Sequence, residues 1–322
     1  MPLKIYIDFE LSPELLERLK EGASEHELIF PKKPASVLSL GALEPSFYEA
    51  DVVFGQPISS EVEKAESLKW IHVSSSGITR YDTPEFRASM KKRGTFVSNS
   101  AHVYDEACAD HALSFMLAQS RKLPQALVCN TPNGSVEWNR LRQGSVPLKG
   151  QKAIIVGFGA IGRQLNKLLA PFEMEITAYR RTPRGNEGIP IVSEATLPSA
   201  LSQADHVINI LPDSAATQNF FNAERFKQFK PGAVFYNIGR GTTVDQASLI
   251  DALDVNQVSE AWLDVTVPEP LDESHPLWKH PRCFITPHTA GGFNNETRAC
   301  VEHFLENLKR FTAGDTLDNR VI

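Results

Sequence analysis

Short apolar runs alternate with longer stretches of helical pattern along this chain of 322 residues, and this alternation limits the fold more than any other feature. One series of runs lies in the first hundred residues, and a second series begins after residue 150. Strands that alternate with helices form parallel sheets covered by helices on both faces. Two series therefore predict two doubly wound α/β domains. The expected strands are 3–7, 28–30, 51–55, 70–73 and 95–97, followed by 153–156, 176–179, 207–211, 233–237, 259–263 and 284–286.

Helix signals separate these strands. Ser12 can cap a helix, and Pro13 suits the first helical position. Two longer amphipathic stretches, 105–122 and 294–311, are predicted to be helices at the junctions between domains, and Pro124 is predicted to stop the first of them. Shorter helices are expected at 161–169, 223–228 and 246–253.

Composition excludes several other classes of protein. Hydrophobic residues make up 42% of the chain and charged residues 22%, which is an ordinary globular mixture. The net charge of −6 argues against a nucleic-acid-binding protein, which normally carries a basic excess. No apolar run approaches the roughly 18 residues needed to span a bilayer, and the N-terminus lacks the core of a signal peptide. The four widely spaced cysteines predict neither a disulfide framework nor a metal site, and they favour a cytoplasmic protein.

A glycine-rich turn follows the expected strand at 153–156. Gly157 permits a tight turn, Gly159 lets the backbone approach a pyrophosphate, and Gly162 allows the next helix to pack closely on the strand. The free N–H groups and the dipole at the helix N-terminus would face that anion. An ordinary glycine-rich turn is the alternative, but the strand–turn–helix setting favours a Rossmann-like dinucleotide site. The full turn is Gly157, Phe158, Gly159, Ala160, Ile161 and Gly162.

The end of the next strand indicates which dinucleotide would bind. An acidic residue about 20 positions on from the glycines binds the ribose of NAD in this type of site. Here Tyr179 is followed by Arg180, Arg181, Thr182 and Arg184, with no carboxylate at the strand end. Guanidinium groups bind a 2′-phosphate through charge-assisted hydrogen bonds. We therefore expect NADP, with NAD as the alternative cofactor; a solvated basic turn would explain the arginines without any cofactor.

Three later segments each place a polar residue after an expected strand, where open α/β sheets bind their ligands. Arg240 lies between two glycines, which leave its backbone free to bring the guanidinium into a cleft. Glu269 lies between two prolines, in a segment expected to be stiff and extended. His288 lies at a strand end beside a tight turn. Each residue alone could have a purely structural role. The three together, in a chain that also has a dinucleotide turn, predict a catalytic site.

The chain resembles the D-isomer-specific 2-hydroxyacid dehydrogenase family over nearly its whole length. The matching segments are 157–162, Asn237 to Gly241 with Val244-Asp245, Leu263 to Leu271, and Thr286 to Gly291. The resemblance implies an outer substrate-binding domain made from both chain ends, an inner dinucleotide-binding domain and a homodimer. It places residues 1–100 and 291–322 in the outer domain and residues 101–290 in the inner one.

The resemblance also implies the catalytic roles. Arg240 orients the keto acid, His288 is the acid/base and Glu269 is its partner. An imidazole with an ordinary pKa of about 6.5 suits the proton transfer that accompanies hydride transfer to a carbonyl. A neighbouring carboxylate favours the imidazolium and orients the ring.

Further contacts are implied by position. Backbone amides of a serine-rich loop (Ser75, Ser76 and Gly77) would hold the substrate carboxylate, together with Arg240 and His288. The serine run is either a polar turn or a feature that widens preference towards hydroxylated or phosphorylated substrates. Trp138 resembles an aromatic of the glyoxylate/hydroxypyruvate reductase pocket, although a core or dimer role is equally open. The remaining cofactor contacts implied are Cys108, Leu211, Pro212, Thr217, Ile238, Gly239, Asp264, Ala290 and Gly291.

The leading hypothesis is an NADPH-preferring reductase of small 2-keto acids such as glyoxylate or hydroxypyruvate, giving a D-2-hydroxy acid. One alternative is an NAD-dependent enzyme similar to phosphoglycerate dehydrogenase. Another is a dinucleotide-sensing interaction protein without catalysis, because corepressors built on this fold keep much of the catalytic set.

Overall fold

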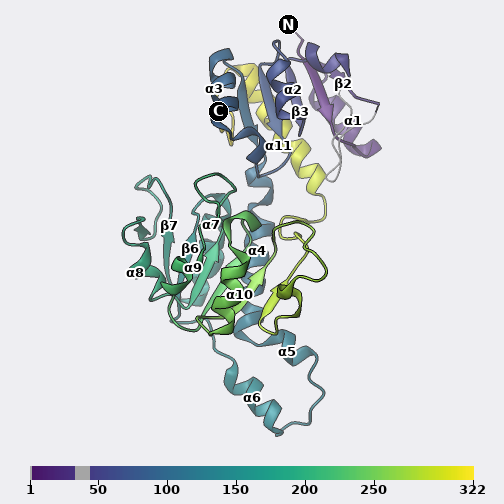
Figure 1. Cartoon of the computed structure of the whole chain (residues 1–322). Coiled ribbons are helices and arrows are strands. Elements are labelled where there is room, and N and C mark those ends of the chain that lie inside the picture. The colour runs from purple at the N-terminus through teal and green to yellow at the C-terminus, as the bar shows by residue number, and fades with distance from the viewer. Residues whose placement is uncertain (1, 33–43) are drawn as a thin grey trace. The chain divides into compact units, whose positions relative to one another are not determined.

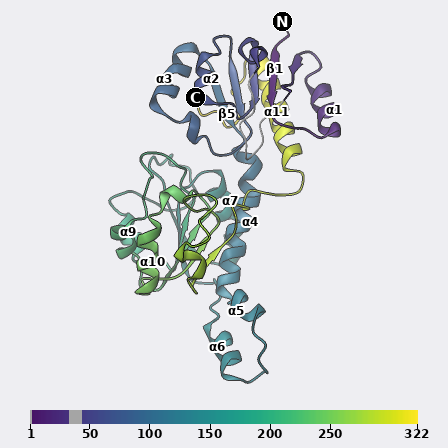
Figure 2. The same ribbon diagram turned by 45° about the vertical axis from the view of Figure 1, so that its right-hand side comes forward.

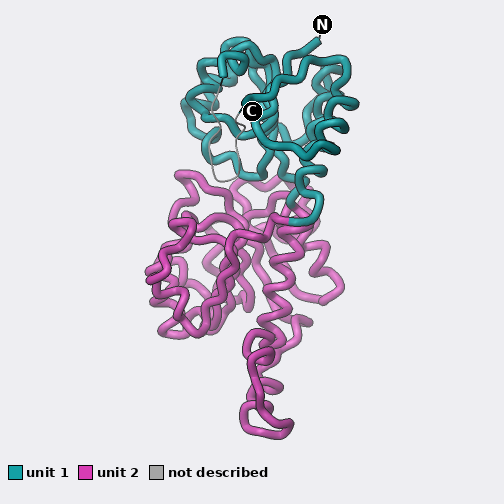
Figure 3. The backbone as a smooth tube through the Cα atoms, turned by 90° about the vertical axis from the view of Figure 1, so that its right-hand side faces the viewer, with its two compact units in different colours: residues 1–104, 293–322 teal, residues 105–292 magenta. Residues whose placement is uncertain are grey.

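The computed structural model describes residues 2–32 and 44–322. The chain divides into two compact units, coloured teal and magenta in Figure 3. Unit 1 consists of Met1–Tyr104 together with Phe293–Ile322, and unit 2 consists of Asp105–Gly292. Both ends of the chain thus belong to one unit, and the middle of the chain forms the other. The sequence analysis places the boundaries between residues 100 and 101 and between residues 290 and 291. The expected roles of the two parts, substrate binding and dinucleotide binding, remain predictions.

Unit 1 is built on a five-stranded parallel sheet with the order β2-β1-β3-β4-β5. The strands carry near-continuous buried residues, as expected where helices cover both faces of a sheet. Its strands are β1 (Lys4–Asp8), β2 (Glu27–Ile29), β3 (Val52–Gly55), β4 (Trp70–Val73) and β5 (Phe96–Asn99).

The helices of unit 1 are α1 (Pro13–Gly22), α2 (Ser59–Lys64), α3 (Pro84–Arg93) and α11 (Glu296–Ala313), with 3₁₀ turns η1 (Pro45–Glu49) and η2 (Thr79–Tyr81). Helices α1 and α11 cover one face, where the ring of Phe304 stacks on those of Phe54 and Trp70 at centroid distances of 4.3 and 5.3 Å. Helices α2 and α3 cover the other face through Val62 and Phe86. The C-terminal helix is therefore part of the core of the N-terminal sheet.

Unit 2 contains a seven-stranded parallel sheet with the order β12-β11-β10-β9-β6-β7-β8. Strands β6 and β9 are neighbours, so the chain builds outwards from β6 in one direction and then from β9 in the other. Such a reversal is the topological switch point at which α/β sheets bind ligands, beside the carboxyl ends of their strands. Its strands are β6 (Lys152–Val156), β7 (Glu175–Tyr179), β8 (Ile191–Val192), β9 (His206–Asn209), β10 (Ala233–Asn237), β11 (Val258–Leu263) and β12 (Cys283–Ile285).

The helices that belong wholly or mainly to unit 2 are α4 (Ala101–Ser120), α5 (Leu123–Leu127), α6 (Val136–Gly144), α7 (Ala160–Leu169), α8 (Leu197–Leu201), α9 (Ala223–Lys227) and α10 (Gln246–Asp254), with 3₁₀ turns η3 (Ala170–Phe172), η4 (Gly241–Thr243) and η5 (Pro276–Lys279). Helices α8, α9 and α10 share one apolar cluster with the sheet. Helices α4 and α7 pack on the opposite face, where Phe115 of α4 lies against Trp262 at a ring distance of 5.4 Å. Figures 1 and 2 show α5 and α6 extending away from the sheet of unit 2.

The predicted fold class is confirmed, because both sheets are parallel and helices cover both faces of each. The predicted capping of α1 is also confirmed, since the backbone N–H of Leu15 donates to Ser12 Oγ at 3.4 Å. Among the residues that the structure describes, no helix is long and apolar enough to cross a membrane. In those same ranges, no group of acidic, histidine and cysteine side chains could hold a metal ion.

Several predicted boundaries differ from the observed ones; the helix predicted from residue 105, for example, begins at Ala101. Two of the differences have a clear physical reason. Pro124 does not stop α4, which ends at Ser120; Lys122 adopts a left-handed conformation and Pro124 lies in the first turn of α5. A proline is compatible with that position because the first N–H groups of a helix have no internal partner. The strand predicted at 207–211 ends at Asn209. The side-chain Oδ1 of Asn209 accepts a hydrogen bond from the N–H of Leu211 (3.1 Å), and the chain turns out of the sheet at this point.

Candidate active site

The glycine turn after β6 is shaped by close backbone contacts. Gly157 has a φ of +104°, and a Cβ atom there would lie 2.7 Å from the carbonyl oxygen of Ile210. A Cβ atom at Gly162 would lie 2.8 Å from the carbonyl oxygen of Gly157, so α7 can approach β6 only with glycine at this position. Both residues are therefore required by the geometry of the turn itself.

Gly159 differs from its neighbours because it faces open space. A Cβ atom at Gly159 would meet no atom within 4 Å, and no side chain caps the N-terminus of α7, which Gly159 precedes. The first N–H groups of a helix have no partner within the helix, and the dipole there attracts an anion. The residues present therefore fit the pyrophosphate of a dinucleotide. Phe158 would contribute only its backbone, because its side chain is buried.

Two further loops meet beside this turn. Gly239 follows β10, and a Cβ atom there would lie 2.6 Å from the carbonyl oxygen of Leu211, which follows β9. Leu211 and Ile238 are buried, and the hydroxyl of Thr217 donates to the carbonyl oxygen of Pro212 at 2.6 Å. The predicted cofactor residues after β6, β9 and β10 thus lie along one edge of the sheet.

A buried polar network supports these loops, and the sequence analysis did not identify it. Asn209 Nδ2 donates to Asn237 Oδ1 (2.9 Å) and to Thr243 Oγ1 (2.7 Å). The N–H of Gly239 donates to Asn237 Oδ1 at 3.1 Å. The carbonyl oxygen of Arg240 accepts hydrogen bonds from Thr243 Oγ1 (2.6 Å) and Asn237 Nδ2 (3.2 Å). The network therefore holds the backbone on both sides of the candidate substrate arginine, and two asparagines at adjacent strand ends were its only signal in the sequence.

The glycines beside Arg240 have a different role from the predicted one. A Cβ atom at Gly241 would lie 1.9 Å from the carbonyl oxygen of Thr266, so these glycines permit close packing of two backbones rather than freedom of movement. The Arg240 guanidinium donates to the carbonyl oxygen of Gly239 at 2.7 Å. The charge of Arg240 is one of the smaller influences on the pKa values of Glu269 and His288, and on each of them it acts in the lowering direction.

His288 and Glu269 form a direct pair. His288 Nδ1 lies 2.8 Å from Glu269 Oε2, and Glu269 Oε1 accepts a hydrogen bond from the N–H of Thr266 at 3.0 Å. This second bond turns the Glu269 segment back on itself, so the predicted extended conformation is wrong. The peptide bonds before Pro268 and Pro270 are both cis. The His288 side chain is 48% exposed, which leaves its ring accessible to a ligand.

The pair favours the charged form of the imidazole. The hydrogen bond to Glu269 raises the pKa of His288 above its usual value, against the opposing effect of burial. Burial acts to raise the pKa of Glu269, but the hydrogen bonds from His288 and from the Thr266 amide outweigh it and lower that pKa. With Nδ1 engaged by the carboxylate, Nε2 is the nitrogen that can exchange a proton with a ligand.

Asp264 fixes the loop that carries His288. Its carboxylate accepts hydrogen bonds from the hydroxyl of Thr286 (2.6 Å) and from the N–H groups of Thr289 (2.8 Å) and Ala290 (2.9 Å). Its carbonyl oxygen accepts the N–H of His288, whose φ of +51° is unusual for a residue other than glycine. The predicted cofactor residue Asp264 is buried, and its contacts in this structure support the loop.

Helix α4 contributes a further residue that sequence reasoning missed. His111 Nε2 lies 3.1 Å from Thr286 Oγ1, whose own proton is donated to Asp264. His111 is therefore the donor in this contact. Burial lowers the pKa of His111, in agreement with a neutral ring that donates from Nε2. Cys108, one turn earlier, is buried, and burial raises the pKa of its thiol to about 12.

The serine-rich loop lies in unit 1, after β4. The carbonyl oxygens of Ser75 and Ser76 accept hydrogen bonds from the N–H of Ser100 (3.1 Å) and from Asn99 Nδ2 (2.7 Å). Ser75 Oγ donates to the carbonyl oxygen of Gly77 at 2.8 Å. Within the described ranges, no acceptor is found for the N–H groups of Ser76 and Gly77. The loop therefore presents unpaired backbone donors, as a carboxylate site requires.

The basic segment after β7 contains an acidic partner that sequence reasoning missed. Glu187 Oε1 accepts a hydrogen bond from the N–H of Arg184 at 2.5 Å and lies 3.3 Å from Arg180 Nη1. The residues at the strand end itself include no carboxylate, as the sequence analysis noted, but the loop returns Glu187 to this position. The Tyr179 hydroxyl donates to Glu194 at 2.8 Å, so this hydroxyl already has a partner within the chain.

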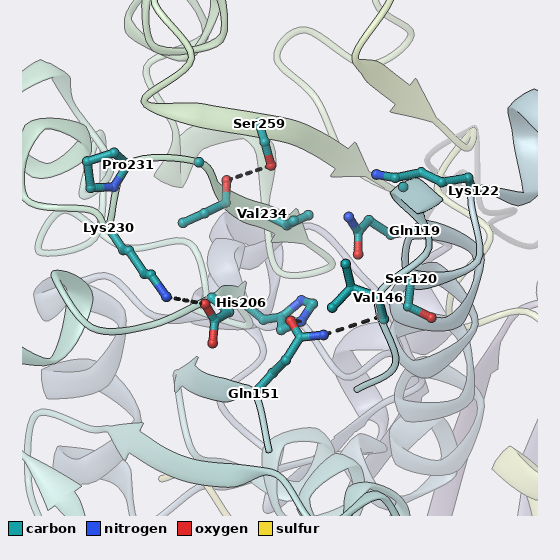
Figure 4. A pocket seen from close by; sticks show the side chains of 14 residues that line it. Gln119, Ser120, Lys122, Val146, Gln151, His206, Lys230, Pro231, Val234 and Ser259 are labelled. Atoms are coloured by element: carbon teal, nitrogen blue, oxygen red, sulfur yellow. Dashed lines mark hydrogen bonds and ion pairs between the residues drawn. The ribbon is translucent and has the colours of Figure 1, made fainter. Parts of the chain in front are cut away.

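A separate cavity of about 240 Å³ opens at the opposite edge of the unit 2 sheet (Figure 4). Its lining includes Gln151, His206 and Ser259, which lie at the amino ends of strands. Their polar atoms bond to one another or to neighbouring groups; for example, His206 Nε2 lies 2.8 Å from Gln151 Oε1. Burial lowers the pKa of His206 to about 4, so the ring is neutral. This cavity is not the predicted site, since the glycine turn and His288 follow carboxyl ends of strands.

Comparison with known proteins gives the same classification as the geometry. Residues 113–290 match the family model described as "D-isomer specific 2-hydroxyacid dehydrogenase, NAD binding domain". The human glyoxylate reductase/hydroxypyruvate reductase is 33% identical over 234 residues, covering 72% of this chain and 70% of that protein. A glyoxylate reductase of Thermofilum pendens is 30% identical over 80% of this chain and 76% of that protein. The crystal structure of an NADPH-dependent glyoxylate/hydroxypyruvate reductase from Sinorhizobium meliloti superposes with a TM-score of 0.75 at 26% identity, covering 100% of this chain and 97% of that one.

The fold and the dinucleotide turn thus define an NAD(P)-dependent oxidoreductase. The chain belongs to the D-isomer-specific 2-hydroxyacid dehydrogenase family, in which it falls in the glyoxylate/hydroxypyruvate reductase branch.

Proposed function

We propose that the protein reduces a small 2-keto acid, such as glyoxylate or hydroxypyruvate, to the D-2-hydroxy acid with NADPH in preference to NADH. The observation that carries this proposal is the 2.8 Å pair of His288 and Glu269. The pair lies after strands β11 and β12 of the same parallel sheet whose β6 leads into the dinucleotide turn. An acid/base pair beside a nicotinamide is what reduction of a carbonyl requires.

The residues of this chain have distinct roles in the proposed reaction. The nicotinamide, when bound, supplies a hydride to the C2 carbonyl of the substrate. His288 donates the proton from Nε2 to the oxygen that becomes the hydroxyl, while Glu269 holds the ring and its charge. The guanidinium of Arg240 binds the carboxylate or the keto oxygen.

The preference for NADPH rests on the arginines after β7. Arg181 and Arg184 are exposed, and in the described part of the chain no ion pair engages either guanidinium. Guanidinium groups bind a 2′-phosphate favourably, whereas a ribose hydroxyl gains little from them. The related reductase from Sinorhizobium meliloti is NADPH-dependent and was crystallised with NADP.

A homodimer is the assembly that we propose. Helices α5 and α6 contain no buried residue, and Leu127, Val128 and Val136 are largely exposed apolar side chains. Exposed apolar groups of this kind are typical of a protein interface. Trp138 also lies on α6, with the Arg142 guanidinium 4.4 Å from its ring centre, so a core role for this residue is not supported.

An initial-rate panel tests the proposal. Purified protein is assayed with glyoxylate, hydroxypyruvate, 3-phosphohydroxypyruvate and pyruvate, each with NADPH and with NADH. We expect the highest kcat/KM for glyoxylate or hydroxypyruvate with NADPH. A preference for the phosphorylated acid with NADH would instead support a phosphoglycerate dehydrogenase-like enzyme. Rates no higher than those of His288→Ala, combined with tight dinucleotide binding, would support a sensor protein and contradict the proposal.

A further inference from the structure

The loop after β7 folds back on the end of its own strand. The backbone N–H of Ala178 donates to the carbonyl oxygen of Pro190 at 3.0 Å, which closes the loop that runs through Glu187. Within it, Glu187 Oε1 bonds to the N–H of Arg184 and contacts Arg180 Nη1. The Glu187 side chain is only 4% exposed and that of Arg180 is 17% exposed. The Glu187 side chain is thus turned inwards although the residue itself is partly exposed and lines a hollow with 183–191, an arrangement that is unusual for a glutamate in a surface loop.

The surroundings of this carboxylate are those of an anion site. The hydrogen bond from the Arg184 N–H is the main cause that lowers the pKa of Glu187, against the effect of burial; the nearby N–H groups of Glu187 itself and Gly185 and the Arg180 charge act in the same direction. A guanidinium combined with successive backbone N–H groups is the donor set that binds phosphate groups. In this structure the carboxylate of Glu187, rather than a bound ligand, occupies these donors.

The arginines of the loop thus fall into two kinds. Arg180 is neutralised by Glu187, whereas the guanidinium groups of Arg181 and Arg184 have no ion pair among the described residues. A phosphate that used Arg180 and the Arg184 amide would have to displace the carboxylate, because two anions cannot share the same donors without strong repulsion. A ribose hydroxyl would instead find in Glu187 an acceptor.

We propose that Glu187 is a specificity-determining residue, which competes with the 2′-phosphate of NADP for Arg180 and the Arg184 amide and thereby limits the preference of this protein for NADPH. The inference rests on the proposed dinucleotide site. In this view the donors that a phosphate would use in the arginine-rich loop are already occupied by the Glu187 carboxylate. Removal of the Glu187 charge would accordingly strengthen binding of the 2′-phosphorylated cofactor.

Equilibrium binding of cofactor fragments tests the proposal without catalysis. The dissociation constants of 2′,5′-ADP and of 5′-ADP are measured by isothermal titration calorimetry for the wild type and for Glu187→Gln. We expect Glu187→Gln to bind 2′,5′-ADP about tenfold more tightly, as removal of a like charge predicts. Binding of 5′-ADP should not tighten. The control Glu173→Gln removes an exposed charge elsewhere in unit 2 and should change neither constant.

A second pair of variants separates competition from simple support of the loop. In an Arg180→Gln background, Glu187→Gln should no longer tighten 2′,5′-ADP binding, because the contested guanidinium is absent. Weaker 2′,5′-ADP binding by Glu187→Gln would show that the residue only braces the loop and would overturn the inference. An equal gain for both fragments would also overturn it. If the wild type and all variants bind neither fragment, the proposed dinucleotide site is wrong and the inference fails with it; a normal wild type with an unresponsive Glu187→Gln rejects the inference alone.

Discussion

At the scale of single residues, the reactivity of His288 depends on one hydrogen bond. Glu269 lies 2.8 Å from Nδ1 and favours the charged imidazole, while the His288 side chain stays 48% exposed. This division gives the two nitrogens different tasks, one for orientation and one for proton transfer. Arg240 adds a second charge to the cluster and acts against the imidazolium. The balance of these two neighbours makes the pair sensitive to single substitutions.

Replacement of His288 removes the proposed proton donor. We expect His288→Ala to lower kcat about 10²- to 10⁴-fold, the usual contribution of a positioned acid or base. Cofactor binding should stay close to that of the wild type when it is measured by the fluorescence of bound NADPH. Turnover that stays at the wild-type level would remove His288 from the reaction.

The pH dependence follows from the raised pKa of His288. Reduction needs the protonated ring, so kcat/KM should be constant at low pH and fall as pH rises through this pKa. In Glu269→Gln the main cause of the upward shift is gone, and the fall should begin at lower pH. The profiles of both proteins are measured by initial rates from pH 5 to 10. A midpoint that does not move would show that Glu269 does not act on the ring.

Arg240 is predicted to act on the keto acid and not on the dinucleotide. Arg240→Ala should lower kcat/KM for the keto acid about 10- to 100-fold, as the loss of a charged hydrogen bond predicts. The dissociation constant of NADPH should change little. Loss of dinucleotide affinity in place of substrate affinity would reassign the residue to the cofactor.

At the scale of elements, the strand ends of unit 2 are held together by side chains rather than by the sheet alone. The network of Asn209, Asn237 and Thr243 joins the loops after β9 and β10 through buried hydrogen bonds. His111 on α4 does the same for the turn after β12 through Thr286. Polar groups in such positions must all find partners, because an unpaired buried group is costly. The site therefore depends on residues that need not touch a ligand.

Loss of one member of this network should destabilise unit 2. Asn237→Ala leaves the amide of buried Asn209 without one acceptor, which should lower the free energy of unfolding by about 1–3 kcal/mol. Urea denaturation followed by fluorescence measures this change. The exposed Asn139→Ala on α6 serves as control and should stay within about 0.5 kcal/mol of the wild type. Equal effects of the two variants would mean that the network does not stabilise the strand ends.

At the scale of the whole molecule, the two ends of the chain share one core. Phe304 of α11 stacks on the rings of Phe54 and Trp70 in the N-terminal sheet, so unit 1 depends on residues some 250 positions apart in sequence. Contacts of such long range form slowly and connect the stability of the unit to its last helix. Unit 2, in contrast, is one continuous segment of the chain.

This arrangement predicts that core substitutions act unit by unit. Phe304→Ala should cost about 3–5 kcal/mol, the usual effect of removing a buried aromatic ring. Hydrogen exchange should then rise in β3 and β4 of unit 1 and stay unchanged in unit 2. Phe226→Ala, a matched truncation in the core of unit 2, should have the converse effect. Uniform exchange throughout either variant would show that the two units unfold as one.

Much of this protein can be predicted from local sequence alone. Alternating apolar runs specify strands and helices because periodicity reports which side of each element is buried. The glycine turn is also readable, since tight turns and close helix approach need glycine at set spacings. The candidate residues Arg240, Glu269 and His288 could be found because each follows a strand end. Parallel topology brings such ends to one edge of a sheet.

The tertiary structure alone decided which side chains serve as partners. Glu187 is seven residues beyond Arg180, and no periodicity in the sequence shows that the loop returns it to that guanidinium. The same holds for Asn237 with Asn209 and for His111 with Thr286, which are far apart along the chain. Hydrogen bonds and ion pairs depend on distances of about 3 Å, and only the folded backbone sets distances on that scale. Local patterns therefore determined the elements of this protein, whereas the packing of those elements determined the partners and charges of its site.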